Sequence, residues 1–175
     1  MLSISEEILQ KGVAHRWRIE SMLITPGKPM HELYLKHCIE KCAPLYSCNR
    51  PPGAAGAIIV SSEKVIYGWV APTLGAPSCK EVGCEMEDGH CIRNVHAEVQ
   101  AIIRAARHGI STSGATIYSL LKPCYNCTKA IIHAGITKIV YAGAAYDEER
   151  TRNILSLANV ECEYVDINLE YGIMK

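Results

Sequence analysis

The sequence predicts an α/β fold in which a mixed sheet carries helices on both faces. Three observations lead to this prediction. Apolar runs of strand length alternate with segments of helical periodicity, Gly and Pro mark the boundaries between them, and two of the runs are close enough to form a hairpin. A chain of 175 residues with 49% hydrophobic and 21% charged residues has the size and balance of one domain with a full core.

The chain begins with a segment that we separate from the main domain. Residues 3–20 carry apolar side chains at helical spacing, and Pro and Gly in residues 25–29 interrupt the pattern. We interpret residues 1–29 as an N-terminal extension, made of a helix and a linker, and residues 30–175 as the domain that carries the function. Because the extension contains no feature of a site, we interpret it as a packing or subunit-contact arm.

A helix and a hairpin are predicted first in the domain. Residues 30–46 have helical spacing, and residues 56–60 and 65–70 are apolar runs suited to an antiparallel pair of buried strands. Residues 71–93 then form a long loop, which in a compact domain is usually functional or anchored. The side of the first helix that we expect to be buried contains Leu33, His37, Cys38, Cys42 and Leu45.

Helices and strands alternate in the remainder of the chain. Gly109 ends the first of these helices, and Pro123 opens the second. The predicted helices are residues 96–108, 124–134 and 147–158, and the predicted strands are residues 115–120, 138–142 and 160–165. For the helix at 96–108, the expected inward positions are Val99, Ile102, Ile103 and Ala106.

Charge and targeting features narrow the class of partner. The chain has 18 basic and 18 acidic residues, so it lacks the general electrostatic footprint of a protein that binds a nucleic-acid polymer, and we expect a small-molecule substrate. No apolar run reaches the length of about 18 residues that crosses a membrane, so no membrane partner is expected. Residues 1–11 show no secretory pattern, which favours a reducing, cytoplasmic location. The nine cysteines are then better explained as metal ligands or core residues than as disulfides.

Two short motifs carry the chemistry, His96-Ala97-Glu98 and Pro123-Cys124-Tyr125-Asn126-Cys127. One imidazole and two thiolates can hold a tetrahedral zinc with one open position, as a catalytic site requires. Both motifs fall at predicted helix starts, where the positive end of the helix favours thiolate. Cys-x-x-Cys alone could be a redox pair or half of a structural zinc site. The order of the two motifs favours the catalytic zinc of nucleobase deaminases.

Glu98 is the predicted catalytic residue. It lies two positions beyond the predicted ligand His96, so it can enter the same cavity without binding the metal. We expect it to take a proton from a zinc-activated water and deliver it to N3 of a cytosine ring as the oxygen attacks C4. It then protonates the departing amine, so that ammonia and a uracil are formed.

The segments around these motifs resemble those of deoxycytidylate deaminases, including the late-competence type. The resemblance runs from about residue 30 to residue 165, and it is carried by residues 79–98, 114–118, 122–127 with Lys129, and 134–141. It implies the cytidine-deaminase fold, a three-layer α/β/α sandwich around a five-stranded mixed sheet. It also implies a homo-oligomer, either a dimer or a hexamer, and the conversion of dCMP to dUMP.

The same resemblance suggests a second metal. Cys48, Cys79, Cys84 and Cys91 are similar to extra cysteines of some bacterial and phage relatives, and they imply a structural zinc. His90 competes with Cys91 as the fourth ligand, because adjacent residues rarely both reach one metal. The alternative is a set of loosely packed free thiols.

The segments that should define the substrate depart from the family. Its Gly-Tyr-Asn-Gly segment, which helps to bind substrate and the effector dCTP, here reads Gly68-Trp69-Val70-Ala71. Arginine is suited to bidentate contact with a phosphate, and an Asn could contact a sugar or cap the helix. The possible substrate-binding residues are Asn94, Arg50, Arg93, Ala97, Lys122 and Tyr146.

We therefore expect a zinc hydrolase that deaminates a cytosine mononucleotide, with dCMP as the first candidate. The altered substrate segment leaves open another cytosine nucleotide, a nucleoside or a modified base. A nucleic-acid-editing deaminase shares the motifs, although the neutral charge argues against it. A non-catalytic zinc scaffold is the third class, and the intact Glu98 argues against that one.

Overall fold

A mixed five-stranded sheet is the centre of the molecule in the computed structural model, which describes residues 28–49, 55–62, 64–87, 89–143 and 149–167. Its strands lie in the order β2-β1-β7-β8-β9. β1 is antiparallel to both of its neighbours, whereas β7, β8 and β9 are parallel. The five strands are β1 (Gly56–Val60), β2 (Val65–Trp69), β7 (Thr116–Leu121), β8 (Lys138–Gly143) and β9 (Glu161–Tyr164).

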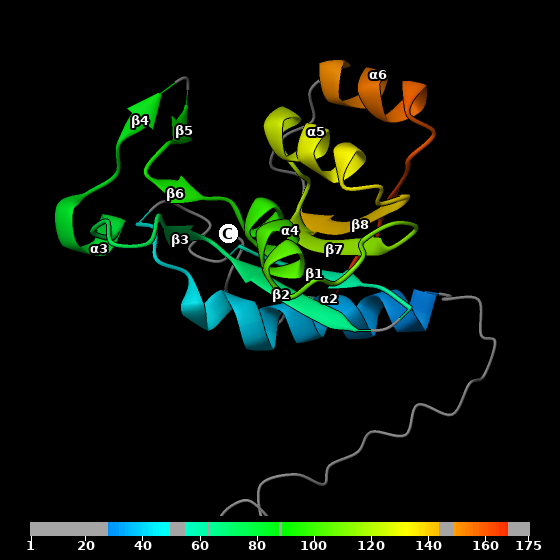
Figure 1. Cartoon of the computed structure of the whole chain (residues 1–175), viewed down its shortest axis with the longest axis horizontal. Coiled ribbons are helices and arrows are strands. Elements are labelled where there is room, and N and C mark those ends of the chain that lie inside the picture. Colours follow the sequence, from blue (N-terminus) through cyan, green and yellow to red (C-terminus); the bar gives the residue numbers. More distant parts are fainter. Residues whose placement is uncertain (1–27, 50–54, 63, 88, 144–148, 168–175) are drawn as a thin grey trace, which may run out of the picture.

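Helices cover both faces of this sheet (Figure 1). α2 (Lys28–Cys42) lies on one face and continues into the short 3₁₀ helix η1 (Ala43–Leu45). α4 (Ala97–Arg107), α5 (Tyr125–His133) and α6 (Glu149–Leu157) lie on the other. The predicted three-layer α/β/α sandwich is confirmed. The helix predicted at residues 3–20 lies outside the described residues, and the division at residue 29 stays a prediction.

Two apolar cores lie on opposite faces of the sheet. Leu35, Ile58 and Val140 are fully buried between α2 and the sheet, and Ile59, Ile117 and Ile139 are fully buried on the side of α4 and α5. A buried side chain of this size contributes about 1.5–3 kcal/mol, more than a typical surface ion pair. The alternating apolar residues of the strands are therefore the main force that holds the three layers together.

The inward faces predicted for the first two helices of the domain are partly wrong. Cys38 and Cys42 of α2 are buried as expected, but Leu33 of α2 and Leu45 of η1 are 59% and 49% exposed. His31 and Leu35 are buried instead. With Cys38 and Cys42 they form one face of the helix, because successive members lie three or four residues apart. His37 is on the margin, where its Nε2 lies 2.7 Å from the hydroxyl of Tyr67.

On α4, three of the four buried residues are alanines, whereas Ile103 and Ala106, which we predicted to be inward, are exposed. Val99 and Ile102 are only half-buried. The inward positions belong to Ala97, Glu98, Ala101 and Ala105. The reason is the close approach of α4 to β2: a Cβ at Gly68 would lie 2.7 Å from the backbone nitrogen of Ala101 and nearer still to the carbonyl oxygen of Ala97. Only small side chains fit at such a contact.

Residues 71–95 form a separate small layer beside the sheet, which we call the cysteine lobe (Figure 1). The sequence predicted a long loop here, and the structure replaces it with short elements. β3 (Ala71–Pro72) pairs with β6 (Asn94–Val95), and β4 (Met86–Glu87) pairs with β5 (His90–Cys91). α3 (Cys79–Val82) begins where the N–H and O–H of Ser78 donate to the Glu81 carboxylate, each over 2.7 Å. Within the described part of the chain, no helix has the length and apolar character needed to cross a membrane.

Candidate active site

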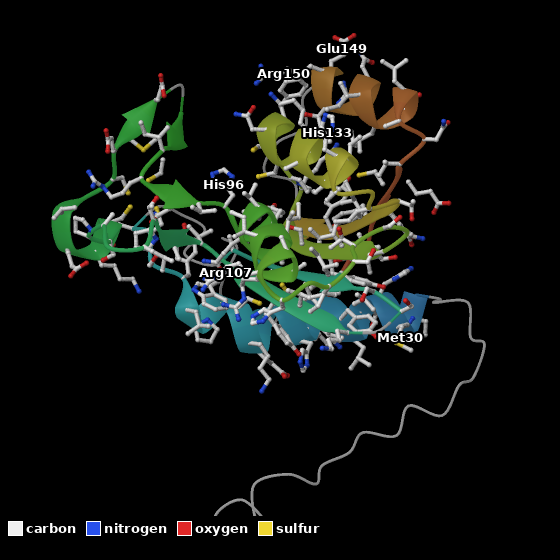
Figure 2. The ribbon with its side chains drawn as sticks, in the orientation of Figure 1. Met30, His96, Arg107, His133, Glu149 and Arg150 are labelled. Carbon is white, nitrogen blue, oxygen red and sulfur yellow. The ribbon has the colours of Figure 1, made fainter. Side chains whose placement is uncertain are left out.

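Two helix N-termini bring the two sequence motifs together. His96 is the N-cap of α4 and Cys124 is the N-cap of α5, and both have extended backbone angles. Cys127 follows in the first turn of α5. Figure 2 labels His96 at the point where β6 leads into α4. Since a helix N-terminus carries a partial positive charge, thiolates are stabilised at this position.

The three donor atoms have the spacing of a tetrahedral zinc site. Nδ1 of His96 lies 3.6 Å from Sγ of Cys124 and 3.3 Å from Sγ of Cys127. A tetrahedral zinc with ordinary bond lengths to nitrogen and sulfur separates those atoms by about 3.5 Å. All three ligand atoms lie within 4.8 Å of one another. The residues therefore fit a zinc ion and leave the fourth position for another ligand.

The charges within this group also suit a metal. A hydrogen bond with Cys127, and a further one with His96, lower the pKa of Cys124 to about 4 against the opposing effect of burial. The hydrogen bond with Cys124 raises the pKa of His96. The bond with Cys124, together with burial, raises the pKa of Cys127. At neutral pH the group therefore holds a thiolate at Cys124, the form in which sulfur binds zinc.

Glu98 points inward from the first turn of α4 and is 7% exposed. Burial raises the pKa of its carboxyl above the ordinary value. Ser119 on β7, which is 2% exposed, donates a hydrogen bond of 3.0 Å from Oγ to Oε1 of Glu98. A raised pKa brings the carboxyl closer to neutral pH, which suits a group that must accept a proton and then release it.

A second group of sulfur atoms lies in the cysteine lobe and the turn beside it. We call Cys48, Cys79, Cys84 and Cys91 the four-cysteine cluster, and their Sγ atoms all lie within 4.8 Å of one another. Cys48 and Cys84 are separated by 3.5 Å, and Cys79 and Cys91 by 3.4 Å. A tetrahedral zinc bound by four thiolates separates its sulfurs by about 3.8 Å. The donor set fits a closed structural site. The side chain of His90, the alternative ligand, lies outside the described atoms.

Polar groups surround the four-cysteine cluster. Burial opposes ionisation of Cys91, but hydrogen bonds from Cys79 and from backbone N–H groups lower the pKa of Cys91 to about 7. Nδ2 of Asn94 donates to Sγ of Cys79 over 2.9 Å. Nδ2 of Asn49 donates to the carbonyl oxygen of Cys79 over 2.7 Å. A donor to sulfur, such as that of Asn94, favours the thiolate form that a metal needs, whereas Asn49 holds the backbone of Cys79.

The predicted substrate contacts lie in different surroundings. Asn94 and Arg93 contact the cysteine lobe, and Nε of Arg93 donates to the carbonyl oxygen of Gly83 over 3.1 Å. Ala97 is buried against β2. Lys122 is buried with Nζ 5.6 Å from the centre of the Tyr141 ring. Arg50 and Tyr146 lie outside the described residues.

Two residues that contact these sites were not predicted from the sequence. Ser119 contacts Glu98, and Asn49 contacts Cys79. The alternation of β7 could have placed Ser119 on the same face as Ile117, but the strand pairing was needed to bring that face against α4. Asn49 stands in a turn with no periodicity. Only its position beside Cys48 could have indicated it.

Comparison with known proteins gives a matching family model and related sequences. The model described as the cytidine and deoxycytidylate deaminase zinc-binding region matches residues 28–143. ComE operon protein 2 of Bacillus subtilis (strain 168) is 35% identical over 119 residues, which are 67% of this chain and 63% of that protein. Deoxycytidylate deaminase of Enterobacteria phage T4 is 46% identical over 69 residues, which are 38% of this chain and 35% of that one. The matches therefore span less than two thirds of these relatives.

Solved structures share the architecture. The dCMP deaminase from the cyanophage S-TIM5, in complex with dCMP and dUMP, is 27% identical and covers 79% of this chain and 98% of its own, with a TM-score of 0.67. The deaminase/reductase from Thermotoga maritima that acts on diaminohydroxyphosphoribosylaminopyrimidine is 23% identical and covers 78% of this chain and 36% of its own, with a TM-score of 0.56. At that lower identity the likeness shows the fold alone.

Proposed function

This chain belongs to the cytidine and deoxycytidylate deaminase family with its zinc-binding region, and from that membership we propose that it hydrolytically deaminates a cytosine mononucleotide. The proposed substrate is dCMP, which is converted to dUMP and ammonia. The phage relatives are deoxycytidylate deaminases, and the cyanophage enzyme is described with dCMP and dUMP bound, which supports this choice.

One observation carries the proposal: the three donors His96, Cys124 and Cys127 lie together, and the buried carboxyl of Glu98 is close enough to help raise the pKa of both His96 and Cys127. A structural zinc needs a fourth protein ligand, but it has no use for a proton carrier. A redox cysteine pair needs neither His96 nor Glu98. The combination is the one that hydrolytic deamination requires.

The residues have separate roles in the proposed reaction. His96, Cys124 and Cys127 would hold a zinc ion, which when bound makes water a better nucleophile at neutral pH. Glu98 accepts a proton from the attacking water and delivers it to ring N3, and it then takes the remaining proton from the new C4 hydroxyl and passes it to the amine. The bond from C4 to nitrogen breaks as the ring carbonyl forms. One water is consumed for each ammonia released.

We further propose that the four-cysteine cluster holds a second, structural zinc. The spacing of its sulfurs, the lowered pKa of Cys91 and the bond from Asn94 to the sulfur of Cys79 support this assignment. The cysteine lobe has little apolar core and only two-residue strand pairs, so a metal is the natural source of its stability.

Ammonia release from a panel of substrates tests the reaction. We expect the highest kcat/KM for dCMP, with lower values for CMP, deoxycytidine and cytidine. Activity on unphosphorylated cytidine alone would contradict a mononucleotide substrate. Turnover of transfer RNA or single-stranded DNA without turnover of free nucleotides would favour the editing class. A folded, zinc-loaded protein without any of these activities would favour the scaffold.

Metal analysis tests the two sites. We expect two zinc equivalents per chain, and one in a Cys84→Ser variant. The matched control is Cys162→Ser, because Cys162 is exposed on β9 and outside both clusters. A single equivalent in the unaltered protein that Cys84→Ser leaves in place would contradict the second site. The homo-oligomer and the cytoplasmic location stay predictions of the sequence.

A further inference from the structure

A row of small residues crosses the sheet beneath the start of α4. Gly68 on β2 is paired with Ala57 on β1, which is paired with Ser119 on β7. Directly paired residues of antiparallel strands share a face, so these three positions all face the layer that contains α4. The neighbouring pairs in the same register are isoleucines, with Ile59 opposite both Ile66 and Ile117.

This row allows the helix to approach the sheet closely. A Cβ at Gly68 would lie 2.8 Å from the Cβ of Ala101. Helix and strand therefore touch backbone to backbone at this end of α4, and the carboxyl of Glu98 comes within hydrogen-bond distance of β7. The contact that results is the bond of 3.0 Å from Ser119 Oγ to Glu98 Oε1.

Ser119 is an unusual residue for its position in the strand. The other buried residues of β7 are Ile117, Tyr118 and Leu120, and Ser119 is 2% exposed among them. A buried hydroxyl without a partner is destabilising, and the hydroxyl of Ser119 has its partner in Oε1 of Glu98, to which it donates. The bond fixes one carboxyl oxygen and with it the rotation of the whole group. The other oxygen, Oε2, is then held in one direction.

We propose that Ser119 is a positioning residue for the proton shuttle: it holds Glu98 so that Oε2 faces the atoms between which the proton moves. The proposal rests on the proposed function of Glu98. A proton carrier needs its accepting atom within hydrogen-bond reach of both partners, and a freely rotating carboxyl meets that condition for only part of the time. Ser119 would therefore act on kcat rather than on substrate affinity.

The experiment compares Ser119→Ala with Ser119→Thr. Alanine removes only the hydroxyl and fits the row, whereas threonine restores a hydroxyl at the same position. We expect kcat on dCMP to fall roughly 10- to 100-fold in Ser119→Ala, with KM and zinc content within about twofold of the unaltered protein. In Ser119→Thr, kcat should return to within about threefold. A purely structural role would not confine the change to kcat, and it would not make activity depend on whether the residue carries a hydroxyl.

Three results would overturn the proposal. Ser119→Ala could keep kcat within about twofold of the unaltered protein, its loss of kcat could match a loss of bound zinc, or Ser119→Thr could be as slow as Ser119→Ala. If the unaltered protein releases no ammonia from any substrate of the panel, the proposed function fails instead. The two failures are therefore distinguishable.

Discussion

Nδ2 of Asn94 donates a hydrogen bond of 2.9 Å to Sγ of Cys79, and Asn94 stands two residues before His96. β6 is thus attached to the four-cysteine cluster through Asn94 and leads directly into His96, a candidate zinc ligand and the N-cap of α4. The backbone of β6 is also held by its pairing with β3. The cysteine lobe therefore fixes the position from which α4 begins.

We predict that Asn94→Ala weakens the second metal site. Removing a donor that supports a metal ligand typically lowers metal affinity about 10- to 100-fold. The measurement is the rate and extent of zinc loss to a competing chelator. Asn153→Ala, on the exposed side of α6, is the matched control and should lose zinc like the unaltered protein. Equal zinc retention in both variants would contradict the support that we assign to Asn94.

Glu98→Gln should keep the shape of the buried side chain but remove its ability to carry a proton. We expect kcat on dCMP to fall about 10²- to 10⁴-fold, because this is the usual contribution of a general acid-base residue. Zinc content should stay the same, since Glu98 is not among the proposed ligands. Glu40→Gln, on the exposed side of α2, should retain full activity. A Glu98→Gln enzyme with an undiminished rate would exclude the proton shuttle.

Gly68→Ala should be strongly destabilising, because the new methyl group would meet the backbone of α4 at Ala97 and Ala101. Overpacking against backbone costs about 3 kcal/mol or more of unfolding free energy. The control is Gly75→Ala, where no atom lies within 4 Å and only the positive φ of 84° opposes the change, at about 1 kcal/mol. Urea unfolding compares the two. An equal loss of unfolding free energy in the two variants would show that α4 can move away from the sheet at no cost in stability.

The ion pair between Lys138 on β8 and Glu163 on β9 leads to a prediction about how the unfolding free energy depends on pH. Nζ of Lys138 lies 2.7 Å from Oε2 of Glu163, and this contact, against partial burial, lowers the pKa of Glu163. A lowered folded-state pKa means that the stabilisation is present above the unfolded-state pKa and is lost as pH falls through the folded-state value. Glu163→Gln should therefore reduce the unfolding free energy at pH 7, by less than about 1 kcal/mol because the pair is partly exposed.

The difference in unfolding free energy between Glu163→Gln and the unaltered protein should shrink as the pH falls from 7 to 3, because protonation of Glu163 gives both proteins a neutral side chain at this position. Glu161→Gln is the control, since Glu161 is 74% exposed and lies 3.5 Å from Lys138. It should have the smaller effect at pH 7. A Glu163→Gln protein that is destabilised equally at pH 3 and pH 7 would contradict the electrostatic origin.

The order of helices and strands along the chain and the donor set His96, Cys124 and Cys127 could be predicted because they depend on local patterns and motif chemistry. The four-cysteine cluster was implied by the family resemblance, and the strand order in the sheet was not predicted. The faces of the helices were harder. The periodicity of apolar residues predicts that Ile103 and Ala106 face inward. At the close contact between α4 and Gly68 there is room only for small side chains, so Ala101 and Ala105 face inward instead. That contact depends on two segments far apart in the chain, so no local pattern contains it.

The interior of the cysteine lobe and the role of Ser119 were not predicted for a related reason. A ladder of two residues, such as Met86–Glu87 with His90–Cys91, is too short to produce an alternating pattern. Ser119 becomes a candidate only after β7 is paired with β1 and covered by α4. In both cases the information is in the tertiary arrangement and not in the spacing of residues along the chain.

The pairing of β1 also determines when the site can form during synthesis. β1 is complete at Val60, but its second neighbour, β7, begins only at Thr116. His96 and Glu98 leave the ribosome before this neighbour, while Cys124 and Cys127 follow it. Long-range pairing of this kind is slow, and the thiols of the nascent chain are reactive while it is pending. The complete donor set of the proposed zinc site therefore exists only after both segments that flank β1 in the sheet have been synthesised.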